Sequence, residues 1–273
     1  MQLSHLLVVL EELWPTRTAE QWDRVGLVSG SSAQEINRIL LTVDVTAEVV
    51  AEAVSGNFDL IISHHPLLLK GITTVSEDTS KGSLLATLIK SNIALYAAHT
   101  NADVSKFGTS AVLANPIGLS NQKALVQNAD GSGLGVVGEL STELSLGKLA
   151  GKLNAVLPAT ATGVRVAGDY ERLVTKVALC AGAGDSYLQA ALEAGADVYI
   201  TSDLRHHPAQ EILEQAKARG LEFALIDISH WAAEFLWLEQ ACKEILAKIS
   251  GPEIVISEIR TDVFDFLMNV PRG

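Results

Sequence analysis

The chain has 273 residues, of which 48% are hydrophobic and 19% charged, so it can bury a substantial core and is not disordered by composition. This length predicts about one to two domains. The formal net charge of −12 opposes binding to a nucleic-acid backbone, which requires lysine and arginine to displace counterions, and it favours bound cations. The two cysteines, Cys180 and Cys242, are too few for a disulfide framework, and we expect both to be reduced.

The N-terminal segment MQLSHLLVVLEELWP is expected to form a helix that closes at Pro15. Leu3, Leu6, Leu7 and Leu10 have helical spacing. The segment lacks the positive region and the cleavage site of a targeting signal. No run in the chain reaches the roughly 18 apolar residues that a membrane span requires. We therefore expect a cytoplasmic protein that does not enter the membrane.

Apolar strands and helical segments alternate along the first half of the chain. ILLTV (39–43) and FDLIIS (58–63) predict two strands, and AEVVAEAVSGN (47–57) predicts a helix between them. This order predicts parallel strands joined by a right-handed crossover. A second helix, SLLATLIKSN (83–92), and a third strand, IALYAAH (93–99), continue the pattern.

The second half repeats this order. ADVYIT (196–201) matches FDLIIS, because both place Asp second, then apolar residues, then a hydroxyl. We predict an α/β protein with two similar α/β lobes formed by an internal duplication. The first lobe would span 1–124 and the second 125–273, with the boundary near the start of a Gly- and Ser-rich stretch. The segment of about 240–273 either belongs to the second lobe or packs back onto the first.

Polar residues gather where the predicted strands end. In doubly wound sheets, ligands bind beyond the carboxyl ends of the strands. Six of the seven histidines follow predicted strands, and acidic residues accompany them: His64, His65, His99, His206, His207, His230, Asp103, Asp203, Asp227 and Glu234. We therefore predict that the functional site lies at these strand ends, in the cleft between the lobes.

Two short patterns can supply carboxylate ligands for a metal. A helix that begins near Ser229 would place His230 and Glu234 on one face, one turn apart, where they can bind one cation or straddle two. The alternative is an exposed polar pair. Asp103 has two carboxylate oxygens and can bridge two ions, or it can serve as a turn former or a helix N-cap.

The adjacent histidines His64 and His65 can supply ligands to a pair of ions. Neighbouring side chains on a strand face opposite ways, but a turning backbone at the strand end can aim both rings into one cleft. A structural role for both rings is the alternative. Three imidazoles with two carboxylates suit borderline divalent ions such as Zn, Mn, Fe, Co or Ni. All-oxygen Ca or Mg sites fit this set less well.

The remaining strand-end histidines have several possible roles. For His99 we favour holding a ligand in place through a hydrogen bond; direct ligation and a satisfied buried imidazole are the alternatives. His206 and His207 either form the first turn of a helix or line the cleft and contact an anionic ligand. His99, His206 and His207 are also candidates for a general acid or base.

Two loop motifs are less specific. Trp22 and Asp23 in WDRVGL either anchor a loop or form a wall of the cleft. CAGAGD (180–185) has some likeness to a phosphate-binding glycine turn, but it lacks the full G-x-G-x-x-G spacing. We therefore expect a tight turn at this position.

Five motifs together resemble a known family. WDRVGL, DLIISHHPLLLKG, AAHTNADVS, VYITSDLRHH and DISHWAAE occur in this order between Trp22 and Glu234. They resemble the successive motifs of the Nif-three-like dinuclear-metal proteins, which are often labelled GTP cyclohydrolase I type 2 homologues. The resemblance implies a toroidal homohexamer whose metal sites face an internal cavity. It also implies a set of metal ligands that consists of His64, His65, Asp103, His230 and Glu234.

A dinuclear site predicts a metal-dependent hydrolase. Two divalent ions bridged by Asp103 or Glu234 would lower the pKa of a bound water and polarise the scissile group. The family label implies GTP as the small-molecule substrate, with opening of its imidazole ring and release of formate; a phosphoester or another cyclic amide fits the same centre. The alternative is a non-enzymatic metal-binding regulatory or scaffold protein whose ions hold the lobes together. Open ligand positions on the ions would favour catalysis.

Overall fold

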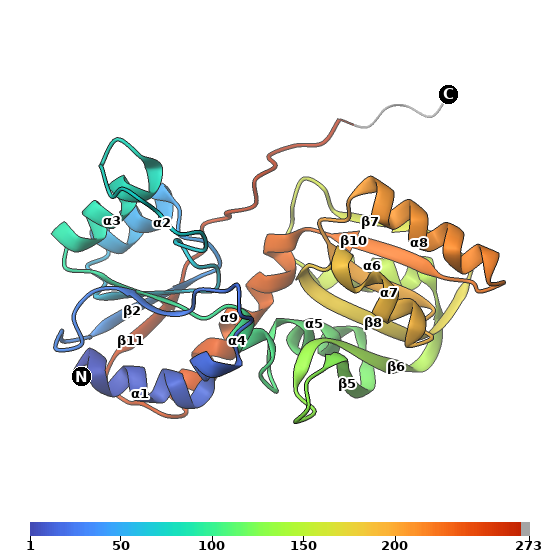
Figure 1. Ribbon diagram of the computed structural model, residues 1–273, viewed down its shortest axis with the longest axis horizontal. Coiled ribbons are helices and arrows are strands. Elements are labelled where there is room, and N and C mark those ends of the chain that lie inside the picture. The colour runs from blue at the N-terminus through green and yellow to red at the C-terminus, as the bar shows by residue number, and fades with distance from the viewer. Residues whose placement is uncertain (269–273) are drawn as a thin grey trace. The chain divides into compact units, whose positions relative to one another are not determined.

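The computed structural model describes residues 1–268 and shows a mixed α/β protein with two sheets, as the sequence predicts (Figure 1). The chain divides into two compact units. The first unit consists of residues 1–105 and 237–261, and the second consists of residues 106–236 and 262–268 among those described. The predicted segment of about 240–273 ends with residues 269–273, which lie outside the described residues.

The first unit is built on a five-stranded sheet with the order β1-β4-β3-β2-β11. Neighbouring strands are parallel except at the edge, where β1 is antiparallel to β4. The strands are β1 (Gly26–Ser29), β2 (Arg38–Thr42), β3 (Leu60–Ser63), β4 (Ala94–Ala97) and β11 (Glu253–Ile256). The helices are α1 (Leu3–Leu13), η1 (Thr16–Thr18), α2 (Ala47–Ser55), α3 (Ser80–Lys90), α4 (Thr100–Asp103) and the part of α9 (His230–Leu246) from residue 237 onward.

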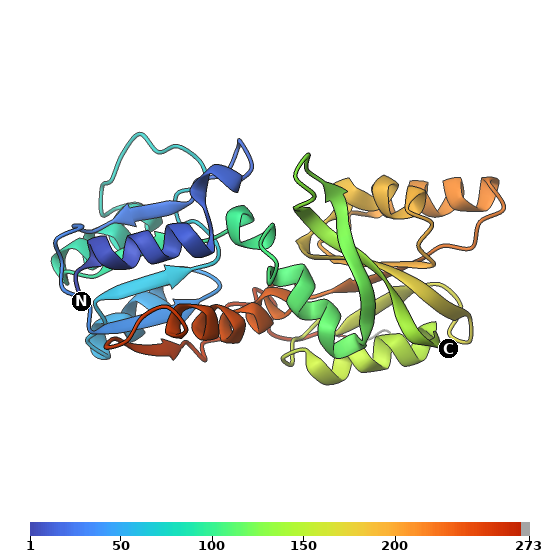
Figure 2. The ribbon, with the colours of Figure 1, turned by 90° about the horizontal axis from the view of Figure 1, so that it is seen from below.

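Helices cover both faces of this first sheet. Apolar residues of α2 and α3 pack with those of β2, β3 and β4 on one face. Helix α1 and the later part of α9 lie on the other face (Figures 1 and 2). The predicted N-terminal helix is confirmed, because Leu3, Leu6 and Leu10 are fully buried along one side of α1. The ring centroids of Trp14 and Trp237 lie 5.2 Å apart in this layer.

The second unit is built on a six-stranded sheet with the order β5-β6-β8-β9-β10-β7, in which β8, β9 and β10 are parallel. The strands are β5 (Leu119–Gln127), β6 (Gly133–Ser145), β7 (Val164–Ala167), β8 (Leu173–Ala183), β9 (Val198–Ser202) and β10 (Ala224–Ile228). Helices α5 (Thr109–Ile117) and α6 (Leu146–Val156) pack on one face. Helices α7 (Leu188–Glu193) and α8 (His206–Ala218) pack on the other, and η2 (Asp185–Tyr187) leads into α7.

The two units share matching hydrogen bonds, which supports the predicted internal duplication. Asp59 Oδ2 accepts from the backbone N–H groups of residues 37 and 38 at 2.7 and 3.0 Å. Asp197 Oδ2 accepts from the N–H groups of residues 175 and 176 at 2.8 and 2.7 Å. In addition, Arg38 and Lys176 each donate to a carbonyl at the end of the crossover helix that follows their strand, α2 and α7 respectively.

The division between the units falls after residue 105, earlier than the expected boundary near 124. The reason is that β5 pairs with β6 and α5 packs against the same sheet, so both belong to the second unit. Later in the chain, β11 pairs in parallel with β2 and forms an edge of the first sheet.

Candidate metal centre

Two neighbouring strands of the first unit bring three histidines together. Strand β3 ends at Ser63, directly before His64 and His65, and β4 ends two residues before His99. These strands are adjacent and parallel, so their carboxyl ends lie at the same edge of the sheet. The three ring centroids are separated by 5.1, 5.2 and 5.4 Å.

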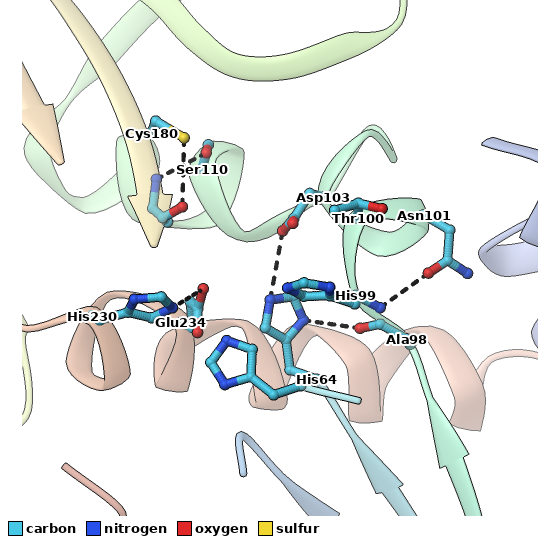
Figure 3. Close-up of polar contacts among 12 residues, drawn as sticks. His64, Ala98, His99, Thr100, Asn101, Asp103, Ser110, Cys180, His230 and Glu234 are labelled. Carbon is cyan, nitrogen blue, oxygen red and sulfur yellow. Dashed lines mark hydrogen bonds and ion pairs between the residues drawn. The ribbon is translucent and has the colours of Figure 1, made fainter. Parts of the chain in front are cut away.

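This imidazole cluster, His64, His65 and His99, is a group that could hold a metal ion. One ligand nitrogen from each ring lies within 4.8 Å of the others. His64 is fully buried, and its Nε2 lies 3.8 Å from Oδ1 of Asp103 at the end of α4. Figure 3 shows the His64 ring between the Ala98 carbonyl and the Asp103 carboxylate.

Hydrogen bonds at Nδ1 orient the rings of His64 and His65. His64 Nδ1 donates to the Ala98 carbonyl at 2.9 Å, and a carbonyl can only accept. His65 Nδ1 lies 2.7 Å from Asp44 Oδ1. In the neutral rings these bonds place the proton on Nδ1 and leave the lone pair of Nε2 for a ligand, as is usual for metal-binding histidines.

A buried carboxylate holds the third ring of the cluster. Asp23 Oδ1 lies 2.9 Å from His99 Nδ1, and its Oδ2 accepts from the N–H and hydroxyl of Thr100 at 3.0 and 2.5 Å. Burial alone would raise the pKa of Asp23, but its interactions with His99 and Thr100 hold that pKa well below its usual value. Asp23 is therefore a negatively charged anchor for both the ring and the loop that precedes β1.

The second unit carries a histidine and a carboxylate on one turn of helix. Helix α9 begins at His230, directly after Ser229, whose hydroxyl accepts from Ala232 N at 3.2 Å. His230 Nε2 and Glu234 Oε1 lie 3.0 Å apart, as the predicted helix start requires (Figure 3). Glu234 is buried.

The electrostatics of His230 favour a positive charge beside Glu234. Burial lowers the pKa of His230, but Glu234 and Asp203 together raise it to about 11. Asp203 Oδ2 lies 2.7 Å from His230 Nδ1, so each ring nitrogen faces a carboxylate. A metal ion bound at Nε2 would take the place of the proton there.

A glycine allows the backbone of β8 to approach this pair. Gly182 has a φ of +79°, and a Cβ atom at this position would lie 2.5 Å from Glu234 Oε1 and 3.4 Å from His230 Nε2. A side chain at residue 182 would therefore collide with the Glu234 carboxylate. Gly182 of the CAGAGD motif therefore allows the backbone of β8 to lie close to the Glu234 carboxylate.

The structure leaves other candidates outside these groups. His206 and His207 form the start of α8 and are exposed, with ring centroids 5.2 Å apart. Among the described residues, no group of potential metal ligands includes either of them. Asp227, also at a strand end, is paired with the Arg165 side chain.

Sequence reasoning missed two residues of the site. Asp44 lies two residues after the end of β2, so the rule that directs attention to strand ends could have found it. The proximity of Gly182 to Glu234 had no local signal, because the two residues are far apart in the chain.

Comparison with known proteins identifies the family. The sequence model of the family described as Duf34/NIF3 (NGG1p interacting factor 3) matches residues 1–263. The chain belongs to the NIF3 family. A similar protein of Streptomyces coelicolor, named GTP cyclohydrolase 1 type 2 homolog, is 44% identical over 248 residues, which cover 89% of this chain and 85% of the relative.

Solved structures share the fold of this chain. A hypothetical protein of Staphylococcus aureus is 29% identical, with a TM-score of 0.86 over 98% of this NIF3 chain and 99% of its own. A Bacillus cereus protein related to NIF3 has the same fold, with 24% identity, a TM-score of 0.86 and the same coverage. Within the described part of the chain, no helix is both long and apolar enough to cross a membrane.

Proposed function

We propose that this NIF3 protein is a dinuclear metal protein that catalyses hydrolysis of a small molecule. The proposed ligands are imidazole and carboxylate groups: His64, His65, Asp103, His230 and Glu234. The observation that carries the proposal is the shared anchoring of the histidines. Each of His64, His65 and His230 has its Nδ1 bonded to a carbonyl or a carboxylate.

The donor set suits a divalent ion of the borderline class. Neutral imidazole nitrogens and carboxylate oxygens are the ligands that Zn, Mn, Fe, Co and Ni accept. The rings of the imidazole cluster, two of which belong to the proposed ligand set, have ligand nitrogens within 4.8 Å of one another; they would repel one another if all were protonated, whereas their lone pairs would together attract a cation. The negative charge of the Glu234 carboxylate, which contacts His230 Nε2, likewise favours a cation.

When bound, such ions polarise a substrate oxygen and lower the pKa of water, which is the chemistry a hydrolase needs. The chain contributes orientation. Asp44 and Asp203 contact Nδ1 of His65 and His230 and so orient these two rings before an ion enters. His99 is partly exposed at the edge of the imidazole cluster and is the candidate for proton transfer to or from the substrate.

Several finer features belong to the proposal. Relatives named GTP cyclohydrolase 1 type 2 homolog make GTP the first substrate to test, with other cyclic amides and phosphoesters next. The toroidal homohexamer and the cytoplasmic location also remain predictions. Light scattering of the purified full chain tests the oligomer.

Formate release from GTP tests the proposed activity. The full chain is loaded with each candidate metal in turn, and formate is measured for the wild type, His64→Ala and Glu234→Gln. The matched control is His5→Ala, because His5 is an exposed histidine on α1. We expect metal-dependent turnover in the wild type and the control and its loss in both ligand variants. If metal-loaded protein turns over neither GTP nor any cyclic amide or phosphoester, the regulatory or scaffold function replaces the hydrolase.

A further inference from the structure

Trp22 differs from the other tryptophans of the chain in its exposure. Trp14, Trp231 and Trp237 have relative exposures of 0%, 7% and 1%, whereas 55% of Trp22 is exposed. An indole is the largest apolar side chain, and leaving it in water forfeits the free energy of its burial. Because the exposed Trp22 lies beside His99 of the imidazole cluster, it is a candidate contact for a ligand.

The position of Trp22 connects it with the imidazole cluster. Its ring centroid lies 5.9 Å from that of His99, with an angle of 77° between the ring planes. The His99 ring in turn lies 5.2 and 5.4 Å from the rings of His64 and His65. The indole is thus separated from His64 and His65, two of the proposed ligands, by one imidazole, and all four residues lie in the first unit.

The loop that carries Trp22 is fixed on both sides. Before it, Glu20 N donates to the Thr100 hydroxyl at 3.0 Å, and Asp23 N donates to the Glu20 carbonyl at 2.9 Å. After it, the Asp23 carboxylate binds both His99 and Thr100. An exposed aromatic ring on a preformed support loses little conformational entropy when a ligand binds.

We propose that Trp22 is a stacking surface for a planar heteroaromatic ligand, whose ring nitrogens and oxygens face the imidazole cluster. This inference rests on the proposed function and narrows its substrate class to a purine or a similar flat ring. Stacking on an indole uses the π-face that every base presents, so it needs no basic side chains. The chain has no cluster of basic residues in this loop, where Arg24 donates to the backbone carbonyl groups of Gln21 and Asp23.

Tryptophan fluorescence tests this assignment, because Trp22 is the exposed indole. The metal-loaded full chain is titrated with guanosine, adenosine and uridine, and with inorganic tripolyphosphate as a ligand without a ring. We expect saturable quenching by at least one nucleoside and none by tripolyphosphate. Trp22→Leu should abolish the quenching and weaken nucleoside binding about tenfold to hundredfold by calorimetry. Trp22→Phe should retain part of the affinity.

Two controls separate stacking from other effects. Tyr170→Leu removes another exposed aromatic ring, in the second unit, and should leave nucleoside affinity unchanged. Metal content should be the same in Trp22→Leu as in the wild type. If Trp22→Leu loses metal instead, the indole supports His99 and the stacking role is wrong.

Three further results would overturn the inference. The first is that no nucleoside binds the wild type at millimolar concentration, and the second is that Trp22→Leu binds nucleosides with unchanged affinity. The third is that acrylamide fails to quench Trp22 in the ligand-free protein, which would mean that a second copy of the chain covers it. Failure of the proposed function would give a different result, namely absence of bound metal or of turnover. The nucleoside titration can then be repeated on the metal-free protein, so the two failures can be distinguished.

Discussion

Asp203 Oδ2 lies 2.7 Å from His230 Nδ1, and the backbone of Asp203 has a φ of +57°. Residues other than glycine rarely adopt this conformation, which costs free energy that the surrounding fold must supply. The unfavourable backbone therefore occurs where a carboxylate meets a proposed metal ligand. The side chain of Asp203, rather than its backbone, therefore accounts for an aspartate at this position.

Asp203→Gly should separate these two properties. Glycine accepts a positive φ, so the unfolding temperature of the metal-free protein should fall little or rise. Loss of the carboxylate should weaken metal binding about tenfold to hundredfold, because His230 is no longer oriented. Competition with a coloured chelator measures the affinity. Asp169→Gly, in an exposed turn, is the control, and equal affinities of Asp203→Gly and wild type would contradict the role of Asp203.

Gly182→Ala should disturb Glu234 through a steric collision. The added Cβ would lie 2.5 Å from Glu234 Oε1, in addition to the strain of the positive φ. Gly131→Ala is the matched control, because its φ of +84° is similar and its Cβ would meet nothing within 4 Å. We expect both variants to lose stability and only Gly182→Ala to lose metal affinity. Equal metal affinity in the two variants would show that the close approach is unimportant.

Asp59→Ala and Asp197→Ala should destabilise their units by similar amounts. Each carboxylate accepts two backbone hydrogen bonds at matching positions. Loss of hydrogen bonds to a charged acceptor costs about 1.5–3 kcal/mol, less where solvent replaces the partner. Urea denaturation measures the free energy of unfolding. A large loss in one variant and none in the other would argue against equivalent roles.

Glu244→Gln should stabilise the protein at neutral pH. Burial raises the pKa of Glu244, and the side chain of Trp14 offsets this only in part. The folded state therefore penalises the ionised carboxylate, and stability falls as pH rises above the unfolded pKa of about 4.3. The gain in unfolding temperature should be absent below about pH 4 and should grow toward pH 7. Glu239→Gln, on the same helix and paired with Lys243, should show no such gain.

The sequence predicted the parallel core of each unit because its signals are local. Short apolar runs such as 39–43 and 58–63 form buried strands, and the histidines that follow them lie at the strand ends. Strand β5 was missed because it is an edge strand with a largely exposed surface, so its residues lack an apolar pattern. Without a strand recognised at 119–127, the expected boundary falls near 124 rather than after residue 105.

The sequence predicted which residues belong to the site better than it predicted the contacts they make. Adjacent parallel strands bring His64, His65 and His99 together, as the rule for strand ends implies. The partners of the rings were not predictable. Asp44 and Asp23 reach His65 and His99 from other loops, and sequence periodicity contains no information on such pairings.

Metal content per chain tests the central claim most directly. The wild type, His65→Ala, Glu234→Gln and the control His5→Ala are loaded with Zn, Mn, Fe, Co or Ni, desalted and analysed by mass spectrometry of the elements. We predict about two ions per chain in the wild type and in His5→Ala, as expected of a two-metal site. Both ligand variants should lose metal, although one lies in each unit. Absence of metal from the wild type, or full retention in both ligand variants, would contradict the account.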